Sequence, residues 1–195
     1  ARLTELFPDE VVEFACDLGV FVVIQSFGRV LGHRRETTED PAVLEGQLRL
    51  TGGGKNVAAE MAGAVIYFEP STPVATTAPP VPFAVATVRK AFSPRVLAVP
   101  PGSTVRFPNQ DPILHNVFSL SGENRFDLGL YRAGDGKSTT FDHSGVVRIF
   151  CNVHHDMVAY VLVVDTPYVA RPDSEGRFRL EDIPDGPGTL TVWHE

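Results

Sequence analysis

Four side chains that can bind a soft metal ion lie within seven residues of one another, in the segment "CNVHHDM" at 151–157. Cys151 offers a thiol, His154 and His155 offer imidazoles, and Met157 offers a thioether. Each of these residues alone is more often an ordinary core or surface residue. Because sulfur ligands select soft metals and imidazole accompanies them in such sites, the grouping predicts a metal site.

Two predicted strands hold this segment. "GVVRIF" before it and "VAYVLVVD" after it are short, rich in β-branched residues and bounded by turn signals such as "DHSG". Side chains alternate along a strand, so Val147, Ile149 and Cys151 share one face. Cys151 is therefore expected at the inward end of a strand, with the histidines and Met157 in the following loop.

A further imidazole comes from "PPGSTVRFPNQDPILHNVFSL", where His115 opens its own strand 36 residues before Cys151. A mononuclear copper site for electron transfer uses two imidazoles, one thiolate and a weak axial thioether. The sequence offers such a set of ligands at the ends of two predicted strands, one that His115 opens and one that Cys151 ends. Zinc accepts Cys and His as well, but structural zinc sites rarely include a thioether, so Met157 favours copper.

The composition limits the class of protein. Of the 195 residues, 43% are hydrophobic, and 16 Pro and 17 Gly are scattered among short apolar runs, which favours one or two β-rich domains. The formal charge of −7 argues against nucleic acid as a partner and allows steering toward a basic one. Two cysteines, Cys16 and Cys151, make no disulfide framework.

The start of the chain shows no secretory signal, since "ARLTELFPDEVVEF" has acids where a basic region belongs. We presume that a signal peptide has been removed, and we expect a periplasmic or extracellular protein. "LGVFVVI" at 18–24 is too short to cross a bilayer, so no transmembrane segment is predicted. Residues 1–39 are expected to be partly helical, with Asp9 capping a helix from Glu10, and carry no recognisable chemistry. Gly19 and the β-branched run "VFVVI" weaken a single long helix, so two shorter elements or a helix followed by a strand are alternatives.

Strand patterns begin at residue 44 and predict a mainly β fold. The strands at both ends of the chain are too few to bury a core alone, so we expect them to pair as one discontinuous sandwich with Trp193 in its core. The predicted parts are a sandwich of 40–83 with 166–195, interrupted by a Pro- and Thr-rich run at 69–83, and an inserted sandwich or barrel at 84–165.

The inserted part resembles a known family. "VPPGSTVRFPNQDPILHNVFS" followed by "FDHSGVVRIFCNVHHDM" is similar to the plastocyanin/azurin-like cupredoxins, in which a "G-x-T-V-x-F-x-N-x-D" strand precedes the first histidine ligand. The Cys-x2-His-x2-Met spacing is like that of amicyanin. The resemblance implies a Greek-key β-sandwich with one copper ion on His115, Cys151, His154 and Met157. His155 then is a neighbour of the ligand or an alternative to it.

The resemblance also implies how the copper is tuned and reached. The N–H of Asn116 would donate to the thiolate, and His154 would lie nearest the surface beside an apolar docking patch that includes Pro112, Ile113 and Met157. Amicyanin and plastocyanin have a proline two residues after the cysteine. This chain has Val153, whose N–H is available as a second donor to the sulfur.

The outer strands have a resemblance of their own. "GAVIYFEP" and "GRFRLEDIP" with "LTVW" are similar to carboxypeptidase regulatory-like sandwiches, and the whole is similar to bacterial methylamine-utilisation or plastocyanin-like proteins. These resemblances imply a type 1 (blue) copper protein that carries single electrons to and from redox partner proteins and is not an enzyme. The alternatives are a copper-holding or delivery protein, and the electron-transfer domain of a copper oxidase or reductase. Multicopper enzymes add His-x-His and His-Cys-His patterns, which the sequence lacks.

Overall fold

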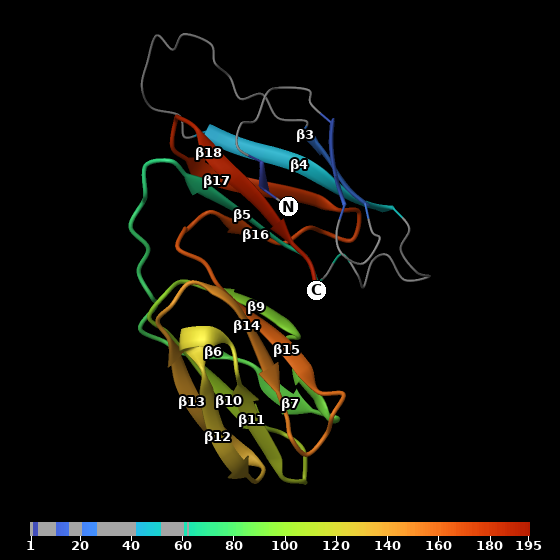
Figure 1. Cartoon of the computed structure of the whole chain (residues 1–195), viewed down its shortest axis with the longest axis vertical. Helices are drawn as coiled ribbons and strands as arrows, with labels where there is room; N and C mark the ends of the chain where they lie inside the picture. The colour runs from blue at the N-terminus through green and yellow to red at the C-terminus, as the bar shows by residue number, and fades with distance from the viewer. Residues whose placement is uncertain (1, 4–10, 16–20, 27–41, 52–60, 62) are drawn as a thin grey trace. The chain divides into compact units, whose positions relative to one another are not determined.

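The fold is mainly β, as the sequence predicts. A computed structural model describes residues 2–3, 11–15, 21–26, 42–51, 61 and 63–195 (Figure 1). The chain forms two compact units, one of residues 1–74 with 166–195 and one of residues 75–165. No helix in the described part of the chain is long and apolar enough to cross a membrane.

Residues 75–165 form two five-stranded sheets. The first has the order β13 (Gly134–Phe141), β10 (Ser103–Asn109), β7 (Ala86–Val88) and β8 (Ala91–Ser93), with β6 (Phe83–Ala84) also paired to β10. The second has the order β12 (Phe126–Tyr131), β11 (His115–Ser119), β14 (Gly145–Phe150), β15 (Val158–Val163) and β9 (Val96–Val99). A short 3-10 helix, η1, spans Gly122–Asn124. Neighbours in these sheets are often distant in sequence, and β9 runs parallel to β15.

The two sheets enclose one core. Alternate residues of β10 point inward, so Val105 and Phe107 are fully buried, and Ile149 of β14 is buried from the other sheet. Burying each such side chain contributes about 1.5–3 kcal/mol. Cys151 and Met157 belong to the same cluster of buried residues. Two of the candidate metal ligands are therefore part of the core of this unit.

The two ends of the inserted unit lie next to each other. The hydroxyl of Thr76 donates a hydrogen bond of 2.7 Å to Oδ1 of Asp165, the last residue of the unit. The unit boundary between residues 74 and 75 falls inside the Pro- and Thr-rich run. The unit thus leaves and re-enters the rest of the chain at adjacent points.

The other unit combines strands from both ends of the chain, so that red and orange strands lie beside cyan and green ones in Figure 1. Its two four-stranded sheets pair β5 with β18 and β4 with β17. The first sheet has the order β1 (Arg2–Leu3), β18 (Gly188–Trp193), β5 (Val65–Pro70) and β16 (Val169–Ala170), and the second has β17 (Arg177–Ile183), β4 (Ala42–Thr51), β3 (Phe21–Ser26) and β2 (Val11–Ala15). Its assignment to the carboxypeptidase regulatory-like family stays a prediction.

Side chains from both sheets form the core of this unit, including Leu48, Ile66, Phe178 and Leu190. Among the described residues, Trp193 is not part of this cluster, contrary to the expectation from the sequence, and its side chain is half-buried. Side chains alternate along β18, so the burial of residues 190 and 192 in the core turns Trp193 to the other face of the sheet.

A glycine is required where β17 begins beside β4. Gly176 has φ +83°, and a Cβ on it would lie 2.1 Å from the carbonyl oxygen of Leu48. The carbonyl of Gly176 accepts a hydrogen bond of 2.8 Å from the N–H of Leu48, so the two backbones must approach this closely. Glycine alone satisfies both demands.

The helix predicted from Glu10 is wrong at Val11–Ala15, where β2 pairs with β3 in antiparallel register. The β-branched residues of "VVEFA" and "FVVIQS" favour strands, and pairing on the edge of β4 satisfies their backbone groups. Residues 4–10, 16–20 and 27–41, over which the predicted helix and its Asp9 cap extend, lie outside the described residues.

Candidate metal centre

Two of the candidate ligands reach the interior from the ends of two paired strands, and a third, Met157, comes just before β15. His115 is the first residue of β11, and Cys151 follows the last residue of β14. The two strands are antiparallel, with Phe118 opposite Phe150. His115 is 0% exposed, Cys151 4% and Met157 1%, so water is excluded from three of the candidate ligands.

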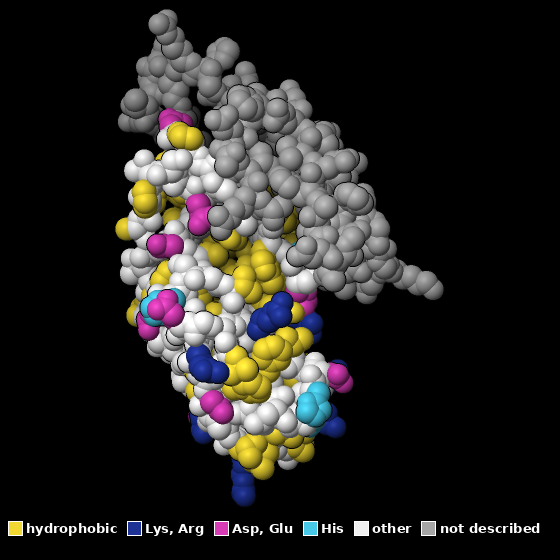
Figure 2. All heavy atoms as spheres, in the orientation of Figure 1, with side chains coloured by type: hydrophobic (Ala, Val, Ile, Leu, Met, Phe, Trp, Pro, Cys, Tyr) yellow, Lys and Arg dark blue, Asp and Glu magenta, His cyan; other side chains and the backbone are white. Residues whose placement is uncertain are grey.

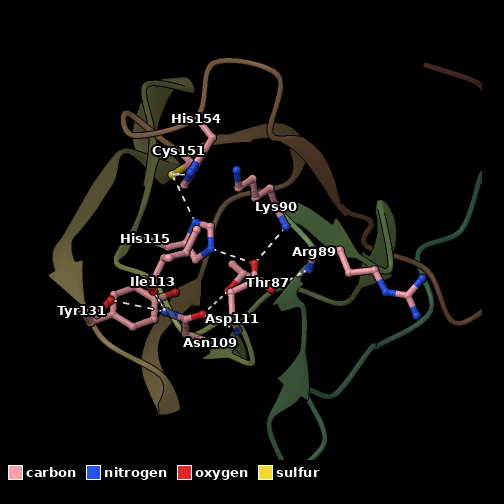
Figure 3. Close-up of polar contacts among 10 residues, drawn as sticks. All are labelled: Thr87, Arg89, Lys90, Asn109, Asp111, Ile113, His115, Tyr131, Cys151 and His154. Atoms are coloured by element: carbon pink, nitrogen blue, oxygen red, sulfur yellow. Dashed lines mark hydrogen bonds and ion pairs between the residues drawn. The ribbon is translucent and has the colours of Figure 1, made fainter.

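His115, Cys151 and His154 converge on one point (Figure 3). The Cys151 sulfur lies 3.7 Å from Nδ1 of His115 and 4.0 Å from Nδ1 of His154. One ligand atom from each residue lies within 4.8 Å of the others. His154 is half-buried, whereas His155 is exposed and is not part of the group.

The orientation of the His115 ring is fixed by Asp111. Nε2 of the ring lies 2.9 Å from Oδ2 of Asp111. A carboxylate can only accept a hydrogen bond, so Nε2 of the neutral ring carries the proton. The lone pair is then on Nδ1, the atom that faces Cys151. A histidine held in this way by a carboxylate is typical of metal ligands.

Asp111 also fixes the turn between β7 and β8. The N–H of Arg89 donates to Oδ1 at 2.6 Å, and the N–H of Lys90 donates to Oδ2 at 2.9 Å. Both turn residues are left-handed, with φ of 51° and 59°. This conformation matches the twist of a two-residue hairpin but costs roughly 1–2 kcal/mol for each residue other than glycine. The carboxylate offsets that cost and joins the turn to the ligand ring.

Electrostatics explain why Asp111 stays ionised inside the protein. Burial raises the pKa of its carboxyl group, but hydrogen bonds from Lys90, His115 and Arg89 lower it. The lowering prevails, so the pKa of Asp111 lies below its usual value.

Asn109 holds the loop that leads to His115. Its Oδ1 accepts hydrogen bonds from the Thr87 hydroxyl at 3.0 Å and from the Asp111 N–H at 2.9 Å. Its Nδ2 donates to the carbonyl of Ile113 at 2.8 Å and to that of Tyr131 at 3.4 Å. Because the polar atoms of this buried amide are all paired, the loop conformation is well defined.

The roles of Asn109 and Asp111 were missed from the sequence. Both occur in the motif "G-x-T-V-x-F-x-N-x-D", at its final two specified positions, and Asp111 lies four residues before His115. The motif indicates that an Asn and an Asp are expected at these two positions. It does not reveal the contact with residues 89–90, which depends on how the sheets pack.

Asn116 connects the two ligand-bearing segments. Its Nδ2 donates to Oδ1 of Asp127 at 2.6 Å, and its Oδ1 accepts from the N–H of Asn152 at 3.5 Å. The contacts shown for the Cys151 sulfur are those with the two imidazole nitrogens. Hydrogen bonds to the sulfur from the N–H groups of Asn116 and Val153 stay predictions.

His154 is the candidate ligand nearest the solvent. Burial of its ring lowers its pKa, the proximity of His115 and of Lys90 lowers it further, and Asp111 opposes them. The neutral form, which binds metals, is therefore favoured.

An apolar surface lies along the two ligand loops. Ile113, Leu114 and Val153 are 37%, 44% and 43% exposed, and Pro112 is exposed beside them. Met157 was expected on this surface, but at 1% exposure it belongs to the core. Its N–H donates to the carbonyl of His154, which closes the ligand loop and turns the thioether inward.

No family model and no curated protein matches the chain. Among solved structures, the chain is similar to a purple cupredoxin from Nitrosopumilus maritimus, with 24% identity over 42% of this chain and 99% of that one, and a TM-score of 0.38. It is also similar to amicyanin from Paracoccus versutus, with 23% identity over 50% of this chain and 98% of the other, and a TM-score of 0.41.

A third similar structure is a copper-containing nitrite reductase from Thermus scotoductus SA-01. Its identity is 26%, its TM-score is 0.43, and the match covers 50% of this chain and 26% of the reductase. In each of these three comparisons, half of the chain or less is matched.

Proposed function

We propose that residues 75–165 bind one copper ion and carry single electrons, as a type 1 copper site does. The observation that carries this proposal is the convergence of one buried thiol and two imidazole Nδ1 atoms within 4.8 Å. In the proposed site His115, Cys151 and His154 would be the three strong ligands, and Met157 would be a weak fourth ligand. Bound copper would supply a centre that changes between Cu(I) and Cu(II).

The donor set fits this ion. Thiolate and thioether sulfur suit Cu(I), and imidazole nitrogen suits Cu(II). His115 is held with Nδ1 free to bind, and its ring position is set by Asp111. Ligands fixed by the core change little between the two oxidation states, which is the requirement for rapid electron transfer.

The exposed side of the site supports exchange with another protein. The half-buried His154 and the exposed Ile113 and Leu114 lie on the loops that carry the ligands. In this proposal, electrons pass through the His154 ring to a redox partner protein docked on the apolar surface. The protein is a carrier rather than an enzyme, and it works in the periplasm or outside the cell.

We also propose that the two units are separate domains, with the copper domain inserted in the outer sandwich. The hydrogen bond that joins Thr76 to Asp165 supports this proposal, because an inserted domain needs its two ends close together.

The experiment is a titration of the chain with Cu(II), followed by visible absorption and voltammetry. An intense thiolate-to-copper band that saturates at one copper per chain, with reversible one-electron reduction, is the expected result. Cys151→Ser should lose the band, because a hydroxyl is a poor ligand at neutral pH, and Cys16→Ser should keep it. Zinc preference with no band would refute the copper assignment.

Two outcomes separate the alternatives. Turnover of O2 or nitrite by the copper-loaded chain would indicate part of an oxidase or reductase. Copper that binds without reversible redox behaviour, and passes to a competing chelator within the mixing time, would indicate a holding or delivery protein.

A further inference from the structure

The negative charge of the chain is not carried by the unit that contains the candidate metal centre. Residues 75–165 include eight Lys and Arg against seven Asp and Glu, whereas the rest of the chain has nine against seventeen. On the face drawn in Figure 2, side chains of both signs are scattered over the unit, in keeping with this balance. At 0.1 M salt, charges act over roughly 10 Å, so a partner responds to the groups beside His154 rather than to the total charge.

Lys90 is a cation close to the exposed ligand. Figure 3 shows its side chain extending toward Cys151 and His154, whereas Arg89 points away from them. Lys90 is exposed, and among the described residues no ion pair joins its ammonium group to an acid. Its charge is also one of those that act on the His154 ring.

The backbone of Lys90 is held in place before any partner binds. The N–H of Lys90 and that of Arg89 are both bound by Asp111, which holds the turn to the ligand ring. A cation whose backbone is held in this way spends less conformational entropy on meeting a partner than one on a mobile loop.

Two acids, Asp111 and Asp156, lie in the segments that carry the candidate ligands. Asp111 is only 8% exposed, and its oxygens are occupied by two N–H groups and His115. Asp156 is exposed in the ligand loop, two residues after His154. Lys90 is the exposed charged group whose side chain Figure 3 shows extending toward the His154 ring.

We propose that the redox partner carries carboxylates on its docking face, and that one of them pairs with Lys90 while apolar groups cover Ile113 and Leu114. This proposal rests on the electron-transfer function above and names the class of partner. The total charge of −7 would instead favour a basic partner, so the sign of the partner's charge tests the proposal.

The first test needs no electron transfer. Hexacyanochromate(III) is an anionic, paramagnetic and redox-inert probe that broadens NMR signals of nuclei near it. With the Cu(I)-loaded chain, it should broaden residues 89–90 and 151–157, and Lys90→Glu should abolish this. Tris(ethylenediamine)chromium(III), a cation, should leave the same signals sharp.

Arg125→Glu is the matched control, since it makes the same change in total charge. Arg125 is exposed and precedes β12 at the end opposite to Tyr131, which pairs with His115. This variant should broaden at residues 89–90 like the native chain. Because Lys90 has a left-handed backbone, Lys90→Gln serves as a second variant, and should show an intermediate loss.

The second test measures oxidation of the Cu(I) chain by ferricyanide, in which one electron passes to give Cu(II) and ferrocyanide. The rate constant should fall with rising ionic strength, and Lys90→Glu should lower it about three- to tenfold at low salt. Arg125→Glu should change it by less than about twofold.

A rate that rises with salt, equal effects of the two charge reversals, or broadening of 151–157 by the cationic probe would each overturn the proposal. Failure of the proposed function would be seen separately, as a chain without the thiolate-to-copper band. The chromium probe can then be applied to the chain as isolated, and it still reports the charge beside His154.

Discussion

Nε2 of His115 lies 2.9 Å from Oδ2 of Asp111, four residues earlier in the chain, and both residues are buried. The same carboxylate binds the two N–H groups of the β7–β8 turn. One side chain therefore sets the tautomer of a candidate ligand and holds the turn that carries Lys90.

Replacing Asp111 should weaken metal binding and stability together. Asp111→Ala frees the His115 ring and leaves two N–H groups without their partner. We expect a loss of about 10–100-fold in Cu(I) affinity, measured by competition with a chelator. Urea unfolding should show a loss of about 1–3 kcal/mol. Asp156→Ala removes the same charge from the exposed loop and should change neither the Cu(I) affinity nor the free energy of unfolding. Equal effects of the two substitutions would show that the loss of charge alone is responsible.

Relief of the left-handed turn should stabilise the protein. Arg89→Gly removes the side chain from a residue with φ of 51° while keeping its N–H for Asp111. The free energy of unfolding should rise by up to about 1 kcal/mol. Arg106→Gly, in the middle of β10, should lower it by about 0.5–1 kcal/mol, because glycine weakens a strand. A loss of stability in Arg89→Gly would mean that the Arg89 side chain contributes more than its backbone strain costs.

Met157→Leu should change the copper centre without unfolding the core. The two side chains are similar in volume, so the free energy of unfolding should change by less than about 1.5 kcal/mol. Loss of the thioether removes a weak donor and should raise the reduction potential, measured by voltammetry. Met61→Leu makes the same change in the buried core of the other unit and should leave the potential as it is. If both variants keep the native potential, Met157 is not a ligand.

Gly176→Ala should destabilise the outer unit and spare the copper site. Its new Cβ would overlap the Leu48 carbonyl, where β17 joins β4. We expect a loss of at least about 2 kcal/mol in thermal unfolding of this unit, with an unchanged visible spectrum. Gly186→Ala, at φ +127° with nothing within 4 Å of the new Cβ, separates backbone strain from overlap and should cost less. A bleached spectrum in Gly176→Ala would argue against two separate domains.

The β class and the grouping around Cys151 could be predicted because both depend on local patterns. Alternation in "STVRFPN" predicts a strand with the bounds of β10, and the strand predicted at "HNVFSL" extends one residue beyond β11. The cysteine and His154 share one loop, so their proximity needs no knowledge of the fold. His115 lies on another strand, and it could be assigned to the same site only from the motif that precedes it in the sequence.

What could not be predicted depends on packing between distant segments. The contact of Asp111 with residues 89–90 follows from the position of the β7–β8 hairpin beside the loop after β10. β12, at Phe126–Tyr131, has the weakly patterned sequence "FDLGLY" and is defined by its pairing with β11. At Val11–Ala15 the acids that suggested a helix were outweighed by sheet pairing on β3. The face of the sheet on which Trp193 lies also depends on strand register, which the composition does not reveal.

The hydrogen bond between Thr76 and Asp165 has a consequence for the order of folding. β4 and β5 precede residues 75–165 in the chain and their partners β17 and β18 follow them, so these two strand pairs cannot form until residues 75–165 have been synthesised. Residues 75–165 contain all of their own strand partners and can fold first. Once folded, they bring residues 76 and 165 together, and the outer unit closes a short loop in place of a long one. By loop-closure entropy this lowers the barrier to its assembly by roughly 2–3 kcal/mol.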